Sequence, residues 1–174
     1  SDLTAFKVGY SKEFGTQYEN EKIPTLREAL QLAKGQIKVC IEIKVLGVEA
    51  AVLKVVNDLE MNNEVIIFSF YYPVLAKIRK LDQDIPTLYL IGKADKLTVG
   101  YARLIDANAI GVGHSTLVTK EYINLVHNNG LELWKWTVND ENQMQQLINV
   151  GLDGLITNFP EKALEKLNTA GNKM

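Results

Sequence analysis

The sequence predicts an α/β fold, a TIM-type (β/α) barrel that is incomplete, with about six of the eight strand-helix units present. Six short β-rich runs alternate with helical patterns, and the centres of consecutive runs lie 22 to 25 residues apart. That spacing holds one strand, one helix of about three turns and two short loops. Because a crossover helix returns the chain to start the next strand in the same direction, the alternation predicts a parallel sheet.

An open doubly wound sheet is the alternative fold. The even period and the lack of a Gly-x-Gly-x-x-Gly turn after the first strand favour the barrel. A closed barrel needs eight strands and typically about 250 residues, whereas this chain has 174. We therefore expect two units to be missing on the N-terminal side. The expected regions are the end of an irregular insertion (1–22), a partial barrel (23–168) and a polar C-terminal tail (169–174).

The elements follow in order along the partial barrel. Thr25 and Glu28 fit a capping box behind Pro24 and predict a helix before the first strand. The β-rich runs span residues 38–45, 64–70, 86–92, 108–115, 131–139 and 153–160. Apolar residues at helical spacing predict helices within 48–61, within 120–130 with a stop at Gly130, and within 139–151 with a stop at Gly151.

Composition excludes several classes of function. Nineteen Lys and Arg against 21 Asp and Glu leave a formal charge of -2, with no basic block that would track a nucleic-acid backbone. The single cysteine, Cys40, excludes an internal disulfide framework and a cysteine-based metal site. No apolar run approaches the roughly 20 residues of a membrane helix, so we expect this chain to be soluble. The compartment stays open.

Two charges in the first strand raise the question of function. Alternation places Lys38, Cys40, Glu42 and Lys44 on one face and Val39, Ile41, Ile43 and Val45 on the other. The apolar face should meet the helices, so Glu42 and Lys44 should point into the barrel near the end where such barrels build active sites. If buried, the carboxylate implies a cation and the lysine implies an anion, such as a metal and a phosphate. Two alternatives stay open: the charges pair with each other, or the strand is a solvated edge.

The segments "IPTLREALQLAKGQIKVCIEIK", "VIIFSFYYPVLAKIRKLDQDIPTLYL" and "ELWKWTVNDENQMQQLINVGLDGLITNFPEKAL" resemble the C-terminal two-thirds of the glycerophosphodiester phosphodiesterase family. The resemblance implies a TIM-type barrel that hydrolyses glycerophosphodiesters to glycerol 3-phosphate and an alcohol with a divalent cation, calcium or magnesium. Glu42 matches the family's metal-coordinating glutamate, Lys44 its phosphate-contacting lysine, and Trp136 a tryptophan of the substrate pocket. A core position is the alternative for Trp136.

Several motifs of the family are not found in this chain. Its His-Arg-Gly, Glu-x-Asp and His-Asp motifs, which carry the acid-base histidines and the other metal-binding carboxylates, have no counterpart here. One carboxylate does not hold a cation that takes six or more oxygens unless water supplies nearly all of them. The metal site is therefore expected to be incomplete, and no residue of this chain is assigned as catalytic.

Three further polar residues have side chains that could serve an active site. His114 follows the fourth strand and should lie at the same end as Glu42, where it can line the substrate pocket. His127 falls in the last turn of a helix, where the dipole favours it without a further function. Ser69 has no histidine partner that would suggest nucleophile activation, and polar pocket lining is its expected role.

Two functions remain. In the first, the chain is part of a metal-dependent glycerophosphodiester phosphodiesterase and inactive alone; the parent would be cytoplasmic or membrane-associated, with a membrane domain possible outside this chain. In the second, it is a non-catalytic binding or assembly module derived from the same barrel. The expected partner is a small-molecule glycerophosphodiester, and no binding to nucleic acid is expected. Open barrel edges should drive self-association or exchange of elements between copies.

Overall fold

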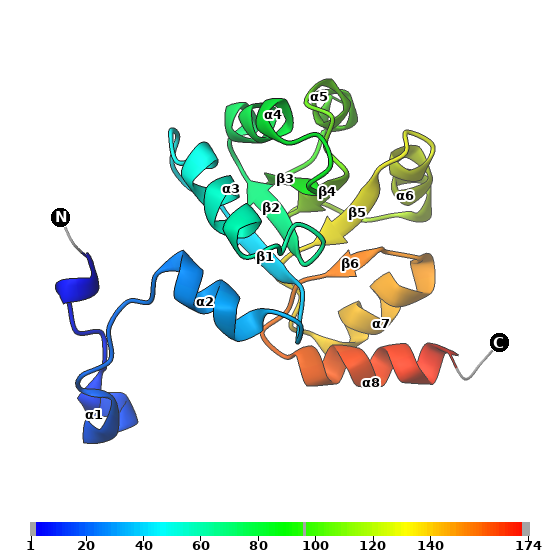
Figure 1. The fold of residues 1–174 in the computed structure, drawn as a ribbon. Helices are drawn as coiled ribbons and strands as arrows, with labels where there is room; N and C mark the ends of the chain where they lie inside the picture. Colours follow the sequence, from blue (N-terminus) through cyan, green and yellow to red (C-terminus); the bar gives the residue numbers. More distant parts are fainter. Residues whose placement is uncertain (1–2, 96, 172–174) are drawn as a thin grey trace.

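A computed structural model describes residues 3–95 and 97–171. Its sheet consists of β1 (Val39–Glu42), β2 (Val65–Ser69), β3 (Thr87–Ile91), β4 (Ala109–Val112), β5 (Glu132–Lys135) and β6 (Gly154–Leu155). All five neighbouring pairs are parallel, and the strands follow one another in chain order. Figure 1 shows the sheet curled into part of a barrel. This confirms the incomplete parallel barrel and excludes the doubly wound order, in which the chain reverses direction across the sheet.

Helices alternate with the strands and cover the outer face of the curl (Figure 1). They are α2 (Leu26–Ala33), α3 (Glu49–Asp58), α4 (Tyr72–Leu81), α5 (Thr98–Leu104), α6 (Lys120–His127), α7 (Glu141–Val150) and α8 (Pro160–Gly171). Within the described ranges, no helix combines the length and apolar character needed to cross a membrane.

Local sequence signals explain several helix ends. The Thr25 side chain accepts from the Glu28 backbone N–H while the Glu28 carboxylate accepts from the Thr25 N–H, which confirms the predicted capping box. Gly151 ends α7 in the left-handed region at φ 88°. Helix α6 ends at His127, and the predicted stop at Gly130 follows three residues later with φ 72°.

The buried side chains form two layers, one on each face of the sheet. The outer layer joins strand residues such as Ile41, Ile43 and Val65 to the helices, while the inner layer is built around Phe68, Leu88, Leu90 and Ala109. The inner face also packs on itself, because the Phe68 and Trp134 rings lie 5.7 Å apart, edge to face, between β2 and β5. Aliphatic and aromatic side chains of the inner face therefore pack together inside the curled sheet.

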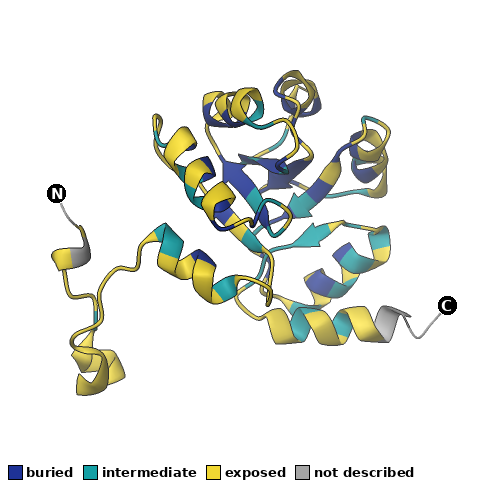
Figure 2. Cartoon of the chain, in the orientation of Figure 1, coloured by how far each residue is buried: buried dark blue, intermediate teal, exposed yellow. Residues whose placement is uncertain are grey.

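The N-terminal segment before α2 extends away from the barrel (Figure 1). It contains η1 (Leu3–Ala5), α1 (Ser11–Phe14) and η2 (Thr16–Tyr18), closed by one antiparallel bridge between Lys7 and Lys22. Figure 2 shows it exposed almost throughout. At the other terminus, residues 169–171 of the expected tail belong to α8, and residues 172–174 lie outside the described residues.

Candidate active site

The carboxyl ends of the six parallel strands lie at one edge of the sheet, where barrels of this kind place functional groups. An open hollow of about 300 Å³ lies at this edge beside β1 and β2. Its lining is Glu42, Ile43, Lys44, Phe70 and Tyr71. We call it the Glu42 hollow.

Glu42 lies on the strand face that alternation predicts, but the exposure of Glu42 and Lys44 differs from the expectation. Ile41 and Ile43 pack in the helix-facing core, so Glu42 between them lies on the other side. However, β1 ends at Glu42, and Lys44 and Val45 lie beyond it with Val45 exposed. The two charged side chains are 34% and 73% exposed. Burial therefore does not require a metal for Glu42 or an anion for Lys44.

Glu42 and Lys44 pair with each other, one of the two alternatives that the sequence left open. Lys44 Nζ lies 3.5 Å from Glu42 Oε2. An exposed pair of this kind is worth about 0–1 kcal/mol, because water screens it and two flexible side chains must be held in place. An incoming anion can therefore compete for the Lys44 ammonium at little cost.

The Phe70 ring of the hollow packs against a second ring, that of Trp136. Phe70 lines the Glu42 hollow and meets Trp136 edge to face, with ring centroids 5.4 Å apart and an interplanar angle of 85°. Trp136 Nε1 donates to the Gly111 carbonyl oxygen at 3.0 Å, which fixes the orientation of the indole. Trp136 is half-buried and belongs to the inner core layer, so it combines a packing role with a place next to the lining of the hollow.

Ser69 anchors the loops of the hollow instead of lining it. Its side chain is fully buried, and its Oγ donates to the Ile43 carbonyl oxygen at 2.8 Å while accepting from the Tyr71 N–H at 3.0 Å. The expectation of polar pocket lining is wrong at this residue. Its hydroxyl ties the chain after β1 to the chain after β2, and so fixes the two loops that carry Lys44 and Tyr71.

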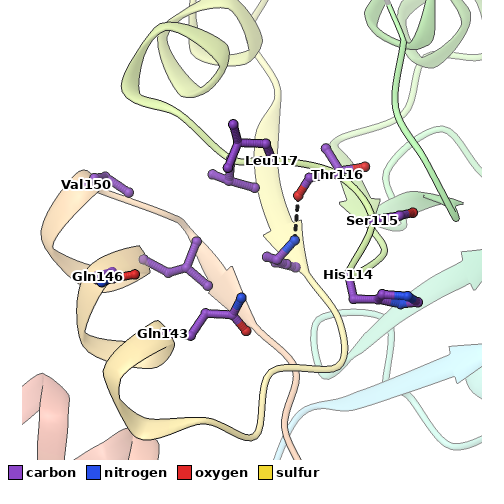
Figure 3. A pocket seen from close by; sticks show the side chains of 10 residues that line it. His114, Ser115, Thr116, Leu117, Gln143, Gln146 and Val150 are labelled. Atoms are coloured by element: carbon purple, nitrogen blue, oxygen red, sulfur yellow. Dashed lines mark hydrogen bonds between the residues drawn. The ribbon is translucent and has the colours of Figure 1, made fainter.

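The two histidines lie apart from the lining of the Glu42 hollow. His114 follows β4 and lines a second hollow, of about 480 Å³, between the loop after β4 and α7. In Figure 3 its ring extends away from α7, at the rim of that hollow. His127 is the last residue of α6, as the sequence predicts, and its Nε2 lies 2.7 Å from Asp153 Oδ2. Since Asp153 also accepts from the Leu133 N–H, this pair joins α6 to the amino end of β5.

The residues that the structure describes do not form a cation site. In the described part of the chain, no three or more His, Cys, Asp or Glu side chains gather where they could hold a metal ion. Glu42 is the carboxylate of its hollow, and its neighbour is an ammonium. Since hard cations take six or more oxygen ligands, no chemical step is assigned here to a metal.

The second hollow contains a buried lysine that the sequence analysis did not predict as a site residue. Lys135, the last residue of β5, lines it and is 3% exposed. Strand alternation could have identified Lys135. It places Lys135 on the same face as the core residue Leu133, opposite to the face of Trp134 and Trp136. Phe70 and Tyr71 were also missed, although Phe70 ends the predicted run 64–70 and both residues follow β2 directly.

The fold and the hollows at the carboxyl ends of parallel strands place the protein in the α/β-barrel class. The model of the glycerophosphoryl diester phosphodiesterase family matches residues 2–162. The chain therefore belongs to this family, which confirms the resemblance found in the sequence.

Curated relatives agree with this assignment. A glycerophosphodiester phosphodiesterase of Caldanaerobacter subterraneus is 29% identical over 95% of this chain and 70% of its own length. One from Bacillus subtilis is 28% identical over 90% of this chain and 58% of its own length. The chain thus spans only part of the relatives that it matches.

Solved structures show the same fold. An Oleispira antarctica phosphodiesterase, in complex with the product sn-glycerol-3-phosphate, aligns with a TM-score of 0.80 at 22% identity, over 95% of this chain and 69% of that one. A glycerophosphodiester phosphodiesterase from Parabacteroides distasonis aligns with a TM-score of 0.76 at 21% identity, over 93% and 72% of the two chains. At such identities the likeness bears on the fold, and function must be argued from the site.

Proposed function

We propose that this chain forms the phosphate- and glycerol-binding part of a glycerophosphodiester phosphodiesterase, which hydrolyses glycerophosphodiesters to glycerol 3-phosphate and an alcohol. The observation that carries the proposal is the Glu42 hollow at the carboxyl ends of the strands, which is lined by an exposed lysine and by Phe70, whose ring packs against Trp136. Membership of the family supports the assignment of this chemistry.

In this proposal each group of the hollow recognises one part of the substrate. The Lys44 ammonium leaves its weak pair with Glu42 and donates to the phosphate oxygens, which lowers their negative charge. Phe70, with Trp136 behind it, covers the carbon side of the glycerol moiety, since an aromatic face packs well against C–H groups. Glu42 accepts from a glycerol hydroxyl or contributes one oxygen to a cation whose remaining ligands come from elsewhere.

Among its described residues, the isolated chain has groups that can bind the substrate phosphate but lacks the groups needed to hydrolyse the diester. Cleavage of a phosphodiester needs a group that activates the attacking oxygen and one that protonates the leaving alkoxide. In the stretch that the structure describes, neither histidine lines the Glu42 hollow. We therefore expect the isolated chain to bind glycerol 3-phosphate and to release none from glycerophosphocholine.

Two measurements test these expectations. The first is calorimetric titration with glycerol 3-phosphate, in which Lys44→Ala should weaken binding about tenfold, since one hydrogen bond to a charged group is lost. Lys38→Ala is the matched control, because Lys38 precedes the same strand at the opposite end of the barrel and is exposed. Equal affinity in wild type and Lys44→Ala would contradict the assigned role of Lys44.

The second measurement is release of glycerol 3-phosphate from glycerophosphocholine with calcium or magnesium, and again with a chelator. No release with intact binding supports the binding part proposed here. Metal-dependent turnover would mean that His114 or a second chain supplies the acid or base. The alternative, a non-catalytic module of other specificity, is favoured if neither binding nor turnover occurs, and little thermal stabilisation by calcium is expected in either case.

A further inference from the structure

We propose that the hollow between the loop after β4 and helix α7 binds a small oxyanion, a phosphate or carboxylate group, through Lys135. We call it the Lys135 hollow. It lies on the helix-facing side of β5 and shares no lining residue with the Glu42 hollow. Binding at this hollow therefore does not depend on the function proposed above.

The first observation is the burial of a cationic side chain. Lys135 follows Leu133 on the helix-facing side of β5, a side that elsewhere in the sheet carries Ile41, Ile67 and Ile110. It is 3% exposed at a place where an aliphatic side chain would fill the core. A buried ammonium loses its hydration, so it needs compensation from its surroundings.

The second observation is what surrounds the Lys135 ammonium. It donates to the Thr116 carbonyl oxygen at 2.7 Å, dashed in Figure 3, and to the Gly113 carbonyl oxygen at 3.2 Å. Both acceptors are neutral, and an ammonium has three donors, so one donor remains. Consistently, burial lowers the pKa of Lys135 below its ordinary value.

Carboxylates close to this region in sequence are engaged elsewhere. Asp140 caps α7 by accepting from the Gln143 N–H, and Glu141 pairs with Lys162 and Lys166 on α8, at 3.0 Å each. Among the lining residues of the Lys135 hollow there is no Asp or Glu. The positive charge is thus left for a ligand to balance.

The third observation is the space and the polar groups around it. The hollow has a volume of about 480 Å³, enough for an orthophosphate ion or a small organic acid. Gln143 and Gln146 line it from α7, and Figure 3 shows the Gln143 amide extending away from α7 toward β5. Amide N–H groups complement the charge of Lys135 as donors to an oxyanion, whereas a cation would be repelled and a neutral ligand would leave the charge unbalanced.

The test is titration of the isotopically labelled 174-residue chain, followed by the backbone amide signals of residues 114–118 and 143–147. Inorganic phosphate is the ligand in one arm and acetate in the other. We expect saturable shifts in wild type, and an affinity about tenfold lower in Lys135→Met, because one charge-assisted hydrogen bond is lost. Shifts in the phosphate arm alone assign a phosphate group, and shifts in the acetate arm alone assign a carboxylate.

Two further variants show whether the shifts arise from binding at the Lys135 hollow. Lys34→Met removes a lysine that also donates to a backbone carbonyl, that of Leu59, but is exposed, and it should leave the shifts unchanged. Gln143→Ala should weaken binding without removing the charge, and it tests the site if Lys135→Met does not fold. The proposal is overturned if wild type shows no saturable shifts at these amides, or if Lys135→Met shows the same shifts as wild type. Shifts near Lys44 and Phe70 report on the Glu42 hollow alone.

Discussion

At the scale of single residues, polar side chains at the strand ends take two different roles. Glu42 and Lys44 stay accessible and pair weakly, so they can exchange partners with a ligand. Ser69 is fully buried and makes two hydrogen bonds, so it contributes to the geometry of the site. Burial and partners, more than residue type, thus separate binding groups from positioning groups.

The Ser69→Ala substitution tests the anchoring role. It leaves the Ile43 carbonyl oxygen and the Tyr71 N–H without their side-chain partner, and we expect the free energy of unfolding to fall by about 1–3 kcal/mol. Affinity for glycerol 3-phosphate should fall as well, because the loops carrying Lys44 and Tyr71 lose their common anchor. Urea denaturation and calorimetric titration measure the two effects.

The matched control for Ser69 is Ser115→Ala. Ser115 Oγ also donates to a backbone carbonyl, that of Gly92, at 2.9 Å, but Ser115 is exposed. Its substitution should change stability by no more than about 0.5 kcal/mol. Equal losses in the two variants would show that burial of the Ser69 hydroxyl has no special effect.

Residue patterns in the sequence predict which face a side chain occupies better than how deeply it is buried. Alternation placed Ile41 and Ile43 against the helices and Glu42 on the other side, as the structure has them. The exposure of Lys44 depends on where β1 ends and on how the sheet curls, and neither follows from alternation. Lys135 differs from Lys44 because it is buried. Alternation alone places Lys135 on the core side of β5, although lysine rarely lies in a core.

At the scale of elements, order and type of the strands were predictable, and their lengths were not. The run 153–160 predicts a full strand, yet β6 consists of Gly154 and Leu155 alone. Pairing continues irregularly beyond it, with the Ile156 N–H donating to the Lys135 carbonyl and the Val138 N–H donating to the Ile156 carbonyl. Such irregular pairing is set by the tertiary context of the last strand, which a local pattern does not contain.

Glycine 154 determines how β6 packs against β5. A Cβ atom at this position would overlap the ring of Trp134, which lies over the glycine in the inner layer. Gly154→Ala should therefore push β6 away from its neighbour and lower the free energy of unfolding by about 1–3 kcal/mol, the usual range for overpacking. Thermal and urea denaturation, with tryptophan fluorescence as the signal, measure the loss.

The same substitution at Gly100 in α5 is the control, and there we expect the free energy of unfolding to rise. Apart from the adjacent residues and the backbone of α5 itself, no atom lies within 4 Å of a Cβ placed at Gly100. Since alanine is about 1 kcal/mol better than glycine inside a helix, this variant should gain stability. If Gly154→Ala were as stable as wild type, the Trp134 ring would be free to move aside, and the inner layer would not hold β6 in place.

At the scale of the whole molecule, the curled sheet leaves two strand edges without partners. Among the described residues β1 pairs with β2 alone, and β6 pairs with β5 alone. Inside the curl, Phe68 of β2 contacts Trp134 of β5, and Phe70 contacts Trp136 just beyond the ends of these strands. These contacts stabilise the curl but do not satisfy the backbone groups at the edges, which are templates for pairing with another chain.

We therefore predict that the 174-residue chain self-associates at micromolar concentration, through an edge that pairs with a second copy or exchanges elements with it. Light scattering after size-exclusion chromatography, in reductant so that Cys40 forms no intermolecular disulfide, measures the mass against concentration. Cys40→Lys places a charge on β1, the kind of residue that blunts open edges, and should shift the chain toward monomer. Leu104→Lys, at a 79% exposed position on α5, is the control for added charge and should leave association unchanged. A wild-type chain that stays monomeric at every concentration would mean that the short edges of β1 and β6 do not recruit a partner.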